Sequence, residues 1–350
     1  MSDIPGPIGP IAVIGAGSWG TALAISLVST GKETRLWARR EDAAAQMRLS
    51  RHNPSYLPDV LLPDELEITS DLAAAVKDAH FVVFATPSQA VRTVAEQLNG
   101  LIESEAIVVS VAKGIENETL MTTTQVLHDV LKDIPEENLG VLYGPSHAEE
   151  VAAGVPTAVV AAARCLRTAE IIQCVFSAPR LRVYVNQDLI GVEIAGSVKN
   201  VMAIATGIVE GVGFGDNTRA ALITRGLAEL KRLGAAMGAD PMTFSGLAGI
   251  GDLVVTCTSK LSRNRFMGEQ VGRGKSVAEV ESEMKMVAEG VRTTKAVCKL
   301  AALHHVEMPI TEAVHAILFE QKPAVQAIEE LMSREVKRED WLYEQSESDT

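Results

Sequence analysis

The fold is decided by Ile11-Ala12-Val13-Ile14-Gly15-Ala16-Gly17-Ser18-Trp19-Gly20, in which an apolar, β-prone run leads directly into G-x-G-x-x-G. An Ala/Leu-rich segment of helical character, 21–30, follows. This order is typical of a dinucleotide-binding turn between a strand and a helix. Gly15 allows a sharp turn, Gly17 allows the backbone to approach a pyrophosphate, and Gly20 allows the helix to pack close to the strand. The free N–H groups of the helix N-terminus would bind the phosphates. A glycine-rich turn without a ligand is the alternative interpretation.

The second predicted strand, 33–38, ends in Arg39 and Arg40. NAD-preferring sites place an Asp or Glu at this position to bind the ribose 2′-hydroxyl. A guanidinium pairs instead with a 2′-phosphate, which a carboxylate would repel. We therefore expect the chain to accept NADP(H) as well as NAD(H), and the strength of any preference stays open. The alternative is a pair of solvated arginines, which suits Arg40 better than Arg39.

Composition is that of a globular protein with two domains. The 350 residues are 47% hydrophobic, 22% charged and only 4% aromatic, so the core must be largely aliphatic. The net charge of −13 argues against nucleic acid as a partner. No apolar run approaches the length of a membrane span, and residues 1–10 do not resemble a signal peptide. Four scattered cysteines indicate a reducing cytoplasm, without disulfides or a metal site.

Apolar runs alternate with helical segments through the first half of the chain. This alternation indicates a mostly parallel, doubly wound, Rossmann-type sheet, expected over residues 8–188. The ligand crevice of such a sheet lies beyond the carboxyl ends of its strands. Further strands are predicted at 80–87, 106–111, 139–146, 157–163 and 182–185, helices at 71–79 and 90–98, and crevice segments at 15–20, 86–88, 112–114 and 144–147.

The second half, 189–340, has helical periods and almost no strand, and we expect an all-α domain. Its first helix, 189–212, is mostly apolar. The stretch 246–253 is interpreted as a glycine-rich joint, and Ser276 opens a capping box. Residues 341–350 are expected to be a frayed acidic tail. The remaining predicted helices are 217–238, 290–305, 310–321 and 324–338.

Two charged residues of this half could carry chemistry. Lys199 lies inside the apolar helix, where burial of an ammonium lowers its pKa unless the ammonium is paired. Such a lysine can pass a proton to a carbonyl oxygen that receives a hydride. Asp252 could pair with it. By spacing alone we favour simpler roles, a lysine that reaches solvent and an aspartate that caps the next helix.

Three further segments are candidates for ligand contacts. The run 262–265, Ser-Arg-Asn-Arg, combines a capping hydroxyl with a guanidinium and an amide at a helix start, which suits a phosphate; an ordinary basic helix start is the alternative. Lys113 follows a buried strand and could touch substrate or cofactor. His147 is interpreted as a structural hydrogen-bonding residue and not as a catalytic base.

Several motifs, in order, resemble those of the bacterial NAD(P)-dependent glycerol-3-phosphate dehydrogenases. The resemblance runs from about Ile11 to Glu320 and is far more specific than the glycine loop alone. The motifs are Gly-Ala-Gly-Ser-Trp-Gly (15–20), Val-Ala-Lys-Gly-Ile-Glu (111–116), Gly-Pro-Ser-His-Ala (144–148), Ser-Val-Lys-Asn (197–200), Gly-Ile-Gly-Asp-Leu (249–253) and Ser-Arg-Asn-Arg (262–265).

The resemblance implies roles for individual residues. It makes Lys199 the proton donor in reduction and acceptor in oxidation, with Asp252 positioning it, against the preference from spacing. Cofactor contacts are implied for Gly15, Gly17, Ser18, Trp19, Gly20, Arg39, Arg40, Tyr56, Lys113, Ala148, Arg263, Val287 and Glu289. Substrate contacts are implied for Lys113, Gly144, Ser146, Lys199, Asn200, Asp252, Thr256, Ser262, Arg263 and Asn264.

The implied reaction is the reversible reduction of dihydroxyacetone phosphate to sn-glycerol 3-phosphate, the backbone precursor of phospholipids. The scattered cysteines favour a cytoplasmic enzyme, and a homodimer is an expectation from the family. Two alternatives stay open. A related dehydrogenase acting on a hydroxy acid would need a carboxylate clamp in place of a phosphate seat. An NADP(H)-binding sensor without catalysis would have been favoured by loss of Lys199 or Asp252, and both are present.

Overall fold

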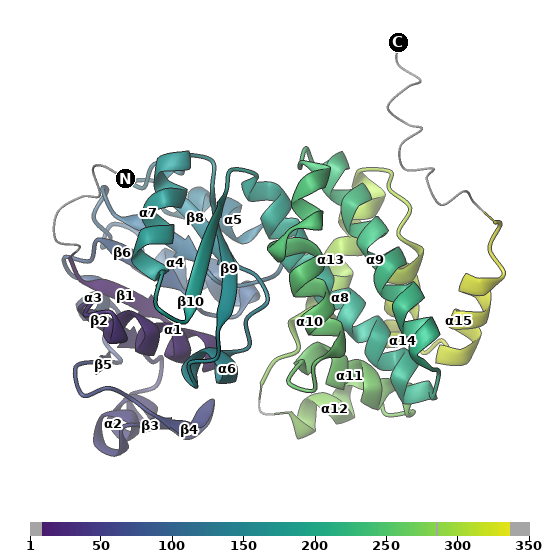
Figure 1. The fold of residues 1–350 in the computed structure, drawn as a ribbon, viewed down its shortest axis with the longest axis horizontal. Helices are drawn as coiled ribbons and strands as arrows, with labels where there is room; N and C mark the ends of the chain where they lie inside the picture. The colour runs from purple at the N-terminus through teal and green to yellow at the C-terminus, as the bar shows by residue number, and fades with distance from the viewer. Residues whose placement is uncertain (1–8, 285, 337–350) are drawn as a thin grey trace, which may run out of the picture.

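The computed structural model describes residues 9–284 and 286–336, which form two parts lying side by side (Figure 1). One part is a sheet with helices on both faces, and the other is a bundle of helices. The expectations for residues 1–8, for the end of the last helix and for the acidic tail lie outside the described residues. The prediction of a Rossmann-type sheet followed by an all-α part is confirmed.

The sheet has eight strands in the order β10-β9-β8-β7-β6-β1-β2-β5. Neighbouring strands are parallel except β8 and β9, which are antiparallel, so the last two strands run against the rest. The chain order reverses between β1 and β6, the usual place of a ligand crevice. The strands are β1 (Ile11–Ile14), β2 (Thr34–Trp37), β5 (Glu67–Thr69), β6 (Phe81–Phe84), β7 (Ile107–Ser110), β8 (Leu139–Tyr143), β9 (Thr157–Ala163) and β10 (Leu181–Asn186); β3 (His52–Asn53) and β4 (Leu57–Leu61) form a separate hairpin.

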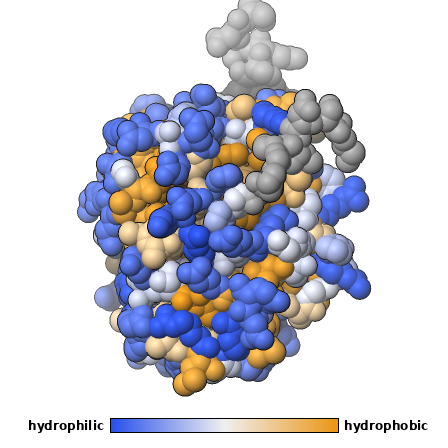
Figure 2. Space-filling view, turned by 90° about the vertical axis from the view of Figure 1, so that its left-hand side faces the viewer, coloured by the Kyte–Doolittle hydropathy of each residue, from blue (hydrophilic) through white to orange (hydrophobic). Residues whose placement is uncertain are grey.

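Helices cover both faces of the sheet (Figure 1). Because successive side chains of each strand point to opposite faces, both sets of side chains are buried. In β1, Ile11 and Val13 pack with Leu23 of helix α1, whereas Ala12 and Ile14 belong to the core on the other face. The face of this part that Figure 2 shows is mostly hydrophilic, with scattered apolar patches. The helices of this part are α1 (Ser18–Ser29), α2 (Glu41–Ser50), α3 (Leu72–Val76), α4 (Val91–Leu98), α5 (Thr123–Val130), α6 (Ala148–Ala152) and α7 (Leu166–Phe176).

Helix α8 (Leu189–Val212) has the bounds predicted from the sequence and is the central helix of the second part. The expectation that no segment is long and apolar enough for a membrane span is wrong for this helix by length and composition. Its most apolar window is entirely buried inside the protein, as in the core helix of a globular domain. The other helices are α9 (Asp216–Ala236), α10 (Asp252–Thr258), α11 (Arg263–Gly272), α12 (Val277–Glu283), α13 (Glu289–Leu303), α14 (Pro309–Phe319) and α15 (Ala324–Met332), with a 3₁₀ turn at 241–245. Two further 3₁₀ turns, at 88–90 and 136–138, belong to the sheet part.

Glycines bring the backbones of α8 and α11 into direct contact. A β-carbon at Gly207 would lie 2.0 Å from the carbonyl oxygen of Arg265, and one at Gly268 would lie 2.0 Å from that of Ile204. No side chain larger than hydrogen fits between the helices at these points. The N-terminus of α11 is thereby held beside the middle of α8.

The predicted glycine-rich joint at 246–253 is wrong in part, because the chain is helical there. A π-helical turn, Leu247–Gly251, leads directly into α10. Glycine is needed for close packing, since a β-carbon at Gly249 would lie 2.1 Å from the carbonyl oxygen of Phe244. Asp252 therefore lies inside a continuous helical segment and is not the N-cap residue that spacing favoured.

Candidate active site

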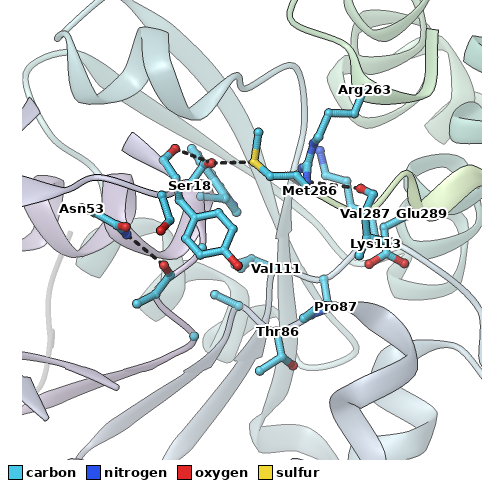
Figure 3. Close-up of a pocket in the computed structure, with 18 of the residues that line it drawn as sticks. Ser18, Asn53, Thr86, Pro87, Val111, Lys113, Arg263, Met286, Val287 and Glu289 are labelled. Carbon is cyan, nitrogen blue, oxygen red and sulfur yellow. Dashed lines mark hydrogen bonds between the residues drawn. The ribbon is translucent and has the colours of Figure 1, made fainter. Parts of the chain in front are cut away.

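A crevice of about 600 Å³ opens where the two parts meet, beyond the carboxyl ends of β1 and β6. Its size is ordinary for a small-molecule site. Figure 3 shows Ser18 on the sheet side facing Arg263 and Met286 on the helical side. The predicted site residues that line it are Gly15, Gly17, Ser18, Trp19, Arg39, Arg40, Tyr56, Lys113, Ser146, Lys199, Asn200, Asp252, Thr256, Ser262, Arg263, Asn264, Val287 and Glu289.

The glycine loop has the geometry that a dinucleotide requires. Gly15 has φ of +127°, and a β-carbon there would lie 2.8 Å from the carbonyl oxygen of Ala85. A β-carbon at Gly20 would lie 2.0 Å from the carbonyl oxygen of Gly15, which explains why helix and strand approach so closely. In contrast, the space over Gly17 is open to 4 Å, as a pyrophosphate at the start of α1 would need.

Buried polar atoms without a partner also line the crevice. The Trp19 Nε1, Thr86 Oγ1 and His147 Nε2 atoms are shielded from solvent and form no hydrogen bond with any of the residues that the structure describes. Leaving such atoms unpaired is costly, and a bound ligand can satisfy them. The residues present therefore fit a cofactor that carries many hydrogen-bonding groups.

The end of the crevice beyond β2 is cationic. Arg39 is exposed, and no hydrogen bond or ion pair engages it within the described part of the chain. Arg40 lies 3.7 Å from Asp42 in an exposed ion pair. The Ser18 hydroxyl donates to the Tyr56 carbonyl oxygen at 2.7 Å and thereby ties the glycine loop to the side of the crevice.

The reactive centre is a buried cluster of two lysines around one aspartate. The Lys199 Nζ atom donates to Asp252 Oδ1 at 2.7 Å and to Thr256 Oγ1 at 2.6 Å. The Lys113 Nζ atom donates to the other oxygen, Oδ2, at 2.7 Å and to the Gly144 carbonyl oxygen at 2.9 Å. Lys199 and Asp252 expose only 5% and 1% of their surfaces, so this lysine does not reach solvent as spacing suggested.

Burial sets the electrostatics of this cluster. It lowers the pKa of Lys199 to about 8, since the attraction of Asp252 offsets burial only in part and the Lys113 cation opposes protonation. Burial alone would raise the pKa of Asp252, but the two neighbouring ammonium groups hold it below its usual value. The aspartate stays ionised while Lys199 can gain or lose a proton near neutral pH.

A cationic and amide-rich seat lies beside the cluster, at the start of α11. Ser262 caps this helix, since its side chain accepts a hydrogen bond from the Arg265 N–H at 3.2 Å. Asn264 is buried and held between the Asn200 side chain and the Gly290 N–H, at 2.9 Å each. Arg263 is exposed to the crevice, and its Nη1 lies 3.3 Å from the Val287 carbonyl oxygen. A phosphate would meet an exposed guanidinium and a helix N-terminus here.

A second acidic residue of the crevice, Glu289, begins α13 and links the two parts. Its side chain accepts hydrogen bonds from the backbone N–H of Ser88 at 3.2 Å and from the Ser88 hydroxyl. Burial raises the pKa of Glu289, and the bonds from Ser88 oppose the rise. Figure 3 shows Val287 and Glu289 beside Lys113, on the same side of the crevice.

Some predicted site residues do not line the crevice. Gly20 allows α1 to pack closely on the glycine loop. The Gly144 carbonyl oxygen accepts a hydrogen bond from Lys113. Ala148 is buried against Ala22 and Leu57.

Sequence reasoning also passed over residues that line the crevice. Thr86 belongs to a predicted crevice segment, but the sequence assigns it no role. The sequence carries no signal for Asn53 or Met286, which lie across the crevice from each other (Figure 3). His147 was interpreted as structural, yet its Nε2 is unpaired. Burial and the Lys199 cation lower the pKa of His147, which favours the neutral imidazole. Its position directly after a strand end was the available signal.

Comparisons with known proteins agree on one family. A model described as "NAD-dependent glycerol-3-phosphate dehydrogenase N-terminus" matches residues 10–169, and the corresponding C-terminus model matches residues 188–329. A Salinibacter ruber protein named glycerol-3-phosphate dehydrogenase (NAD(P)+) 1 is 57% identical over 332 residues, covering 95% of this chain and 97% of its own. A similarly named protein from Chlorobium phaeobacteroides is 54% identical over 94% of this chain and 98% of its own. The crystal structure of glycerol-3-phosphate dehydrogenase from Coxiella burnetii has a TM-score of 0.89 at 40% identity, covering 93% of this chain and 99% of its own.

Proposed function

Because this chain belongs to the NAD(P)-dependent glycerol-3-phosphate dehydrogenase family, we propose that its crevice reduces dihydroxyacetone phosphate reversibly to sn-glycerol 3-phosphate, with Lys199 moving the proton. The enzyme uses NAD(H) and NADP(H), as its relatives do. The observation that carries the proposal is the buried Lys199–Asp252 pair beside the exposed Arg263. A proton donor and a phosphate seat then lie in one crevice with the glycine loop.

The cofactor would lie along the sheet side of the crevice. Gly15, Gly17 and the first turn of α1 would hold the pyrophosphate, and Arg39 the 2′-phosphate of NADP(H). Trp19, Arg40 and Tyr56 would flank the cofactor. Ala148, which is buried against Ala22 of α1, would support that helix. Val287 and Glu289 would reach the cofactor from the helical part. The bound nicotinamide supplies the hydride for reduction and accepts it in oxidation.

Lys199 would hold the proton that the reaction consumes. Reduction of a carbonyl places negative charge on its oxygen, and a nearby acid must neutralise that charge. Protonated Lys199, oriented by Asp252 and Thr256, can donate from Nζ. In oxidation the neutral amine can accept the proton from the hydroxyl. Lys113 would stabilise the same oxygen and keep Asp252 ionised.

The substrate phosphate would bind at the start of α11. Arg263 would form charge-assisted hydrogen bonds to it, and Ser262, Asn264 and Asn200 would complete the seat, with Gly144 and Ser146 on the opposite side. A hydroxy acid would present a carboxylate instead, and the family assignment argues against that alternative. The presence of Lys199 and Asp252 argues against a sensor without catalysis.

The wider assignments follow from the same proposal. Residues 8–188 would form the cofactor-binding domain and residues 189–340 the substrate-binding domain. The product would feed phospholipid synthesis in the cytoplasm, and a homodimer is expected from the family.

The direct test is consumption of NADPH or NADH, followed by absorbance, with dihydroxyacetone phosphate as substrate. We expect strong activity with this compound and sharp discrimination against unphosphorylated dihydroxyacetone and against 2-oxo acids. Equal activity with the phosphorylated and unphosphorylated ketones would contradict the phosphate seat. Activity with 2-oxo acids alone would contradict the proposed substrate.

A further inference from the structure

Glu193 is a buried carboxylate that the proposed reaction does not use. It lies on α8, six residues before Lys199, and exposes only 2% of its surface. Its Oε1 accepts hydrogen bonds from the Thr124 N–H at 2.9 Å and the Thr123 hydroxyl at 3.1 Å. Its Oε2 accepts from the hydroxyls of Thr122 at 2.8 Å and Thr124 at 2.6 Å. Four donors from three consecutive residues thus surround one carboxylate.

These donors belong to the other part of the molecule, at the start of helix α5. Thr122 is the N-cap residue of α5 and forms a capping box with Gln125. A helix N-terminus attracts a carboxylate through its free N–H groups and dipole. No lysine or arginine within residues 9–284 and 286–336 pairs with Glu193. Burial raises the pKa of Glu193, and the hydrogen bonds from Thr122, Thr123 and Thr124 oppose this rise. These four hydrogen bonds, called here the Glu193 anchor, join α8 directly to the sheet part.

A second set of contacts leads from the Glu193 anchor to the reactive cluster. The Thr123 hydroxyl lies 3.2 Å from the Tyr143 hydroxyl, which donates to the Ala112 carbonyl oxygen directly before Lys113. Tyr143 also packs on α8, since a β-carbon at Gly196 would lie 2.6 Å from its ring. The anchor thus contacts the elements that carry both lysines of the cluster.

Directional bonds matter here because the rest of α8 is packed mainly through apolar side chains. Apolar burial has no preferred direction and tolerates small rotations of a helix, whereas hydrogen bonds fix orientation. Besides Glu193 and Lys199, the only charged residue of α8 is Glu210, near its far end. Orientation of the first half of α8 against the sheet therefore depends on Glu193.

We propose that Glu193 is a positioning residue, which docks α8 on the first turn of α5 and thereby holds Lys199 Nζ between Asp252 and Thr256. The inference rests on the proposed role of Lys199. Loosening the anchor would let Lys199 move away from Asp252. Loss of that attraction would lower the pKa of Lys199 further, because burial would then be less opposed. The other titratable groups that face Lys199 are Lys113, Cys257 and His147, and none of them forms a hydrogen bond or ion pair with the Glu193 side chain.

The structure offers a matched control in Glu229. This carboxylate is equally buried, lies on α9, and accepts bonds from the Ile310 N–H at 2.6 Å and the Thr311 N–H at 3.2 Å at the start of α14. It has the same chemistry as Glu193 but joins two elements of the helical part only, and it does not line the crevice. A substitution there should affect stability alone.

The test compares Glu193→Gln with Glu229→Gln. Thermal unfolding, kcat per folded molecule, KM for dihydroxyacetone phosphate and the pH dependence of kcat are measured for each. Both variants should lower Tm. Only Glu193→Gln should lower kcat, by about 10-fold to 10²-fold as expected for a small misplacement of a catalytic group, with KM changed far less. The pH above which reductive kcat falls should move to lower values in this variant only.

Thr124→Val and Thr124→Ser provide a second pair in case Glu193→Gln does not fold. Valine removes the Thr124 hydroxyl that donates to Glu193 at 2.6 Å, so Thr124→Val should lower kcat in the same way as Glu193→Gln but less strongly. Serine keeps this hydroxyl, so Thr124→Ser should keep kcat close to that of the parent. The inference is overturned if Glu193→Gln has a lower Tm but keeps the kcat of the parent and its dependence on pH. It is also overturned if Glu193→Gln and Glu229→Gln lower kcat by the same factor. A Lys199→Met variant run in parallel separates this failure from failure of the proposed function, because only the latter leaves Lys199→Met active.

Discussion

At the scale of single residues, the pairing of Lys199 could not be predicted from its surroundings in the sequence. A lysine within an apolar helix has two outcomes, solvation or a buried partner, and the partner here lies 53 residues away. Spacing favoured solvation for Lys199 and capping for Asp252, and both preferences are wrong in the structure. Only the resemblance of several motifs indicated the pair. The unpaired atoms of Thr86 and His147 had no sequence signal strong enough to assign them.

The lowered pKa of Lys199 predicts opposite pH dependences for the two directions. Reduction needs protonated Lys199, so its kcat should fall as the pH rises through about 8. Oxidation needs the neutral amine, so its kcat should rise over the same range. Single-turnover rates measured from pH 6 to 10 in both directions would check this. If both directions responded in the same sense, Lys199 would not be the group that moves the proton.

Arg39 should determine how well the enzyme uses NADPH. Because no group of the described chain engages this guanidinium, it is free to bind a 2′-phosphate. Arg39→Asp should weaken NADPH use relative to NADH by on the order of 1.5–3 kcal/mol, the value of a lost charge-assisted contact. The ratio of kcat/KM for the two cofactors is the measurement. Arg180→Asp is the control, since Arg180 is an exposed arginine that does not line the crevice. An unchanged ratio in Arg39→Asp would refute the assignment.

Arg263 should act mainly on substrate affinity. Arg263→Ala removes the exposed guanidinium at the start of α11 but leaves the buried Asn264 in place. KM for dihydroxyacetone phosphate should rise strongly, whereas activity with unphosphorylated dihydroxyacetone should change little. Steady-state kinetics with both ketones would show this, and a parallel loss for the two compounds would contradict a phosphate contact.

At the scale of elements, long periodic segments could be predicted and short ones could not. The buried strands and α8 were evident because continuous apolar runs leave few alternatives. The short strand β5 and the β3–β4 hairpin have mixed patterns, and the antiparallel direction of β9 depends on pairing with distant residues. The glycines of the stretch 246–253 predicted a joint, whereas Leu247–Gly251 is helical and Gly249 packs closely on the Phe244 backbone.

The contact between α8 and α11 should be intolerant of any side chain. Gly268→Ala would place a β-carbon 2.0 Å from the Ile204 carbonyl oxygen, so the helices must separate. We expect a loss of about 1–3 kcal/mol or more in the free energy of unfolding, and a raised KM because α11 carries the phosphate seat. Gly215→Ala is the control, since its β-carbon would meet nothing within 4 Å, and chemical denaturation would compare the two. Equal stability of both variants would show that the helices can separate without cost.

At the scale of the whole molecule, the crevice exists only where the two parts meet. The sheet part contributes the glycine loop, Arg39 and Lys113, and the helical part contributes Lys199, Asp252 and Arg263. A sequence can indicate each group, but their mutual distances depend on how the parts dock, which local patterns do not encode. The lysine–aspartate cluster spans this junction, and the proposed chemistry depends on it.

The most direct test of this account is single-turnover hydride transfer by Lys199→Met, measured beside NADPH binding by fluorescence. Methionine keeps much of the volume of the buried side chain but cannot donate a proton. The account predicts normal folding, NADPH affinity close to that of the parent, and a rate of hydride transfer lower by about 10²–10⁴. A folded variant that binds NADPH and transfers hydride at nearly the parent rate would contradict the account.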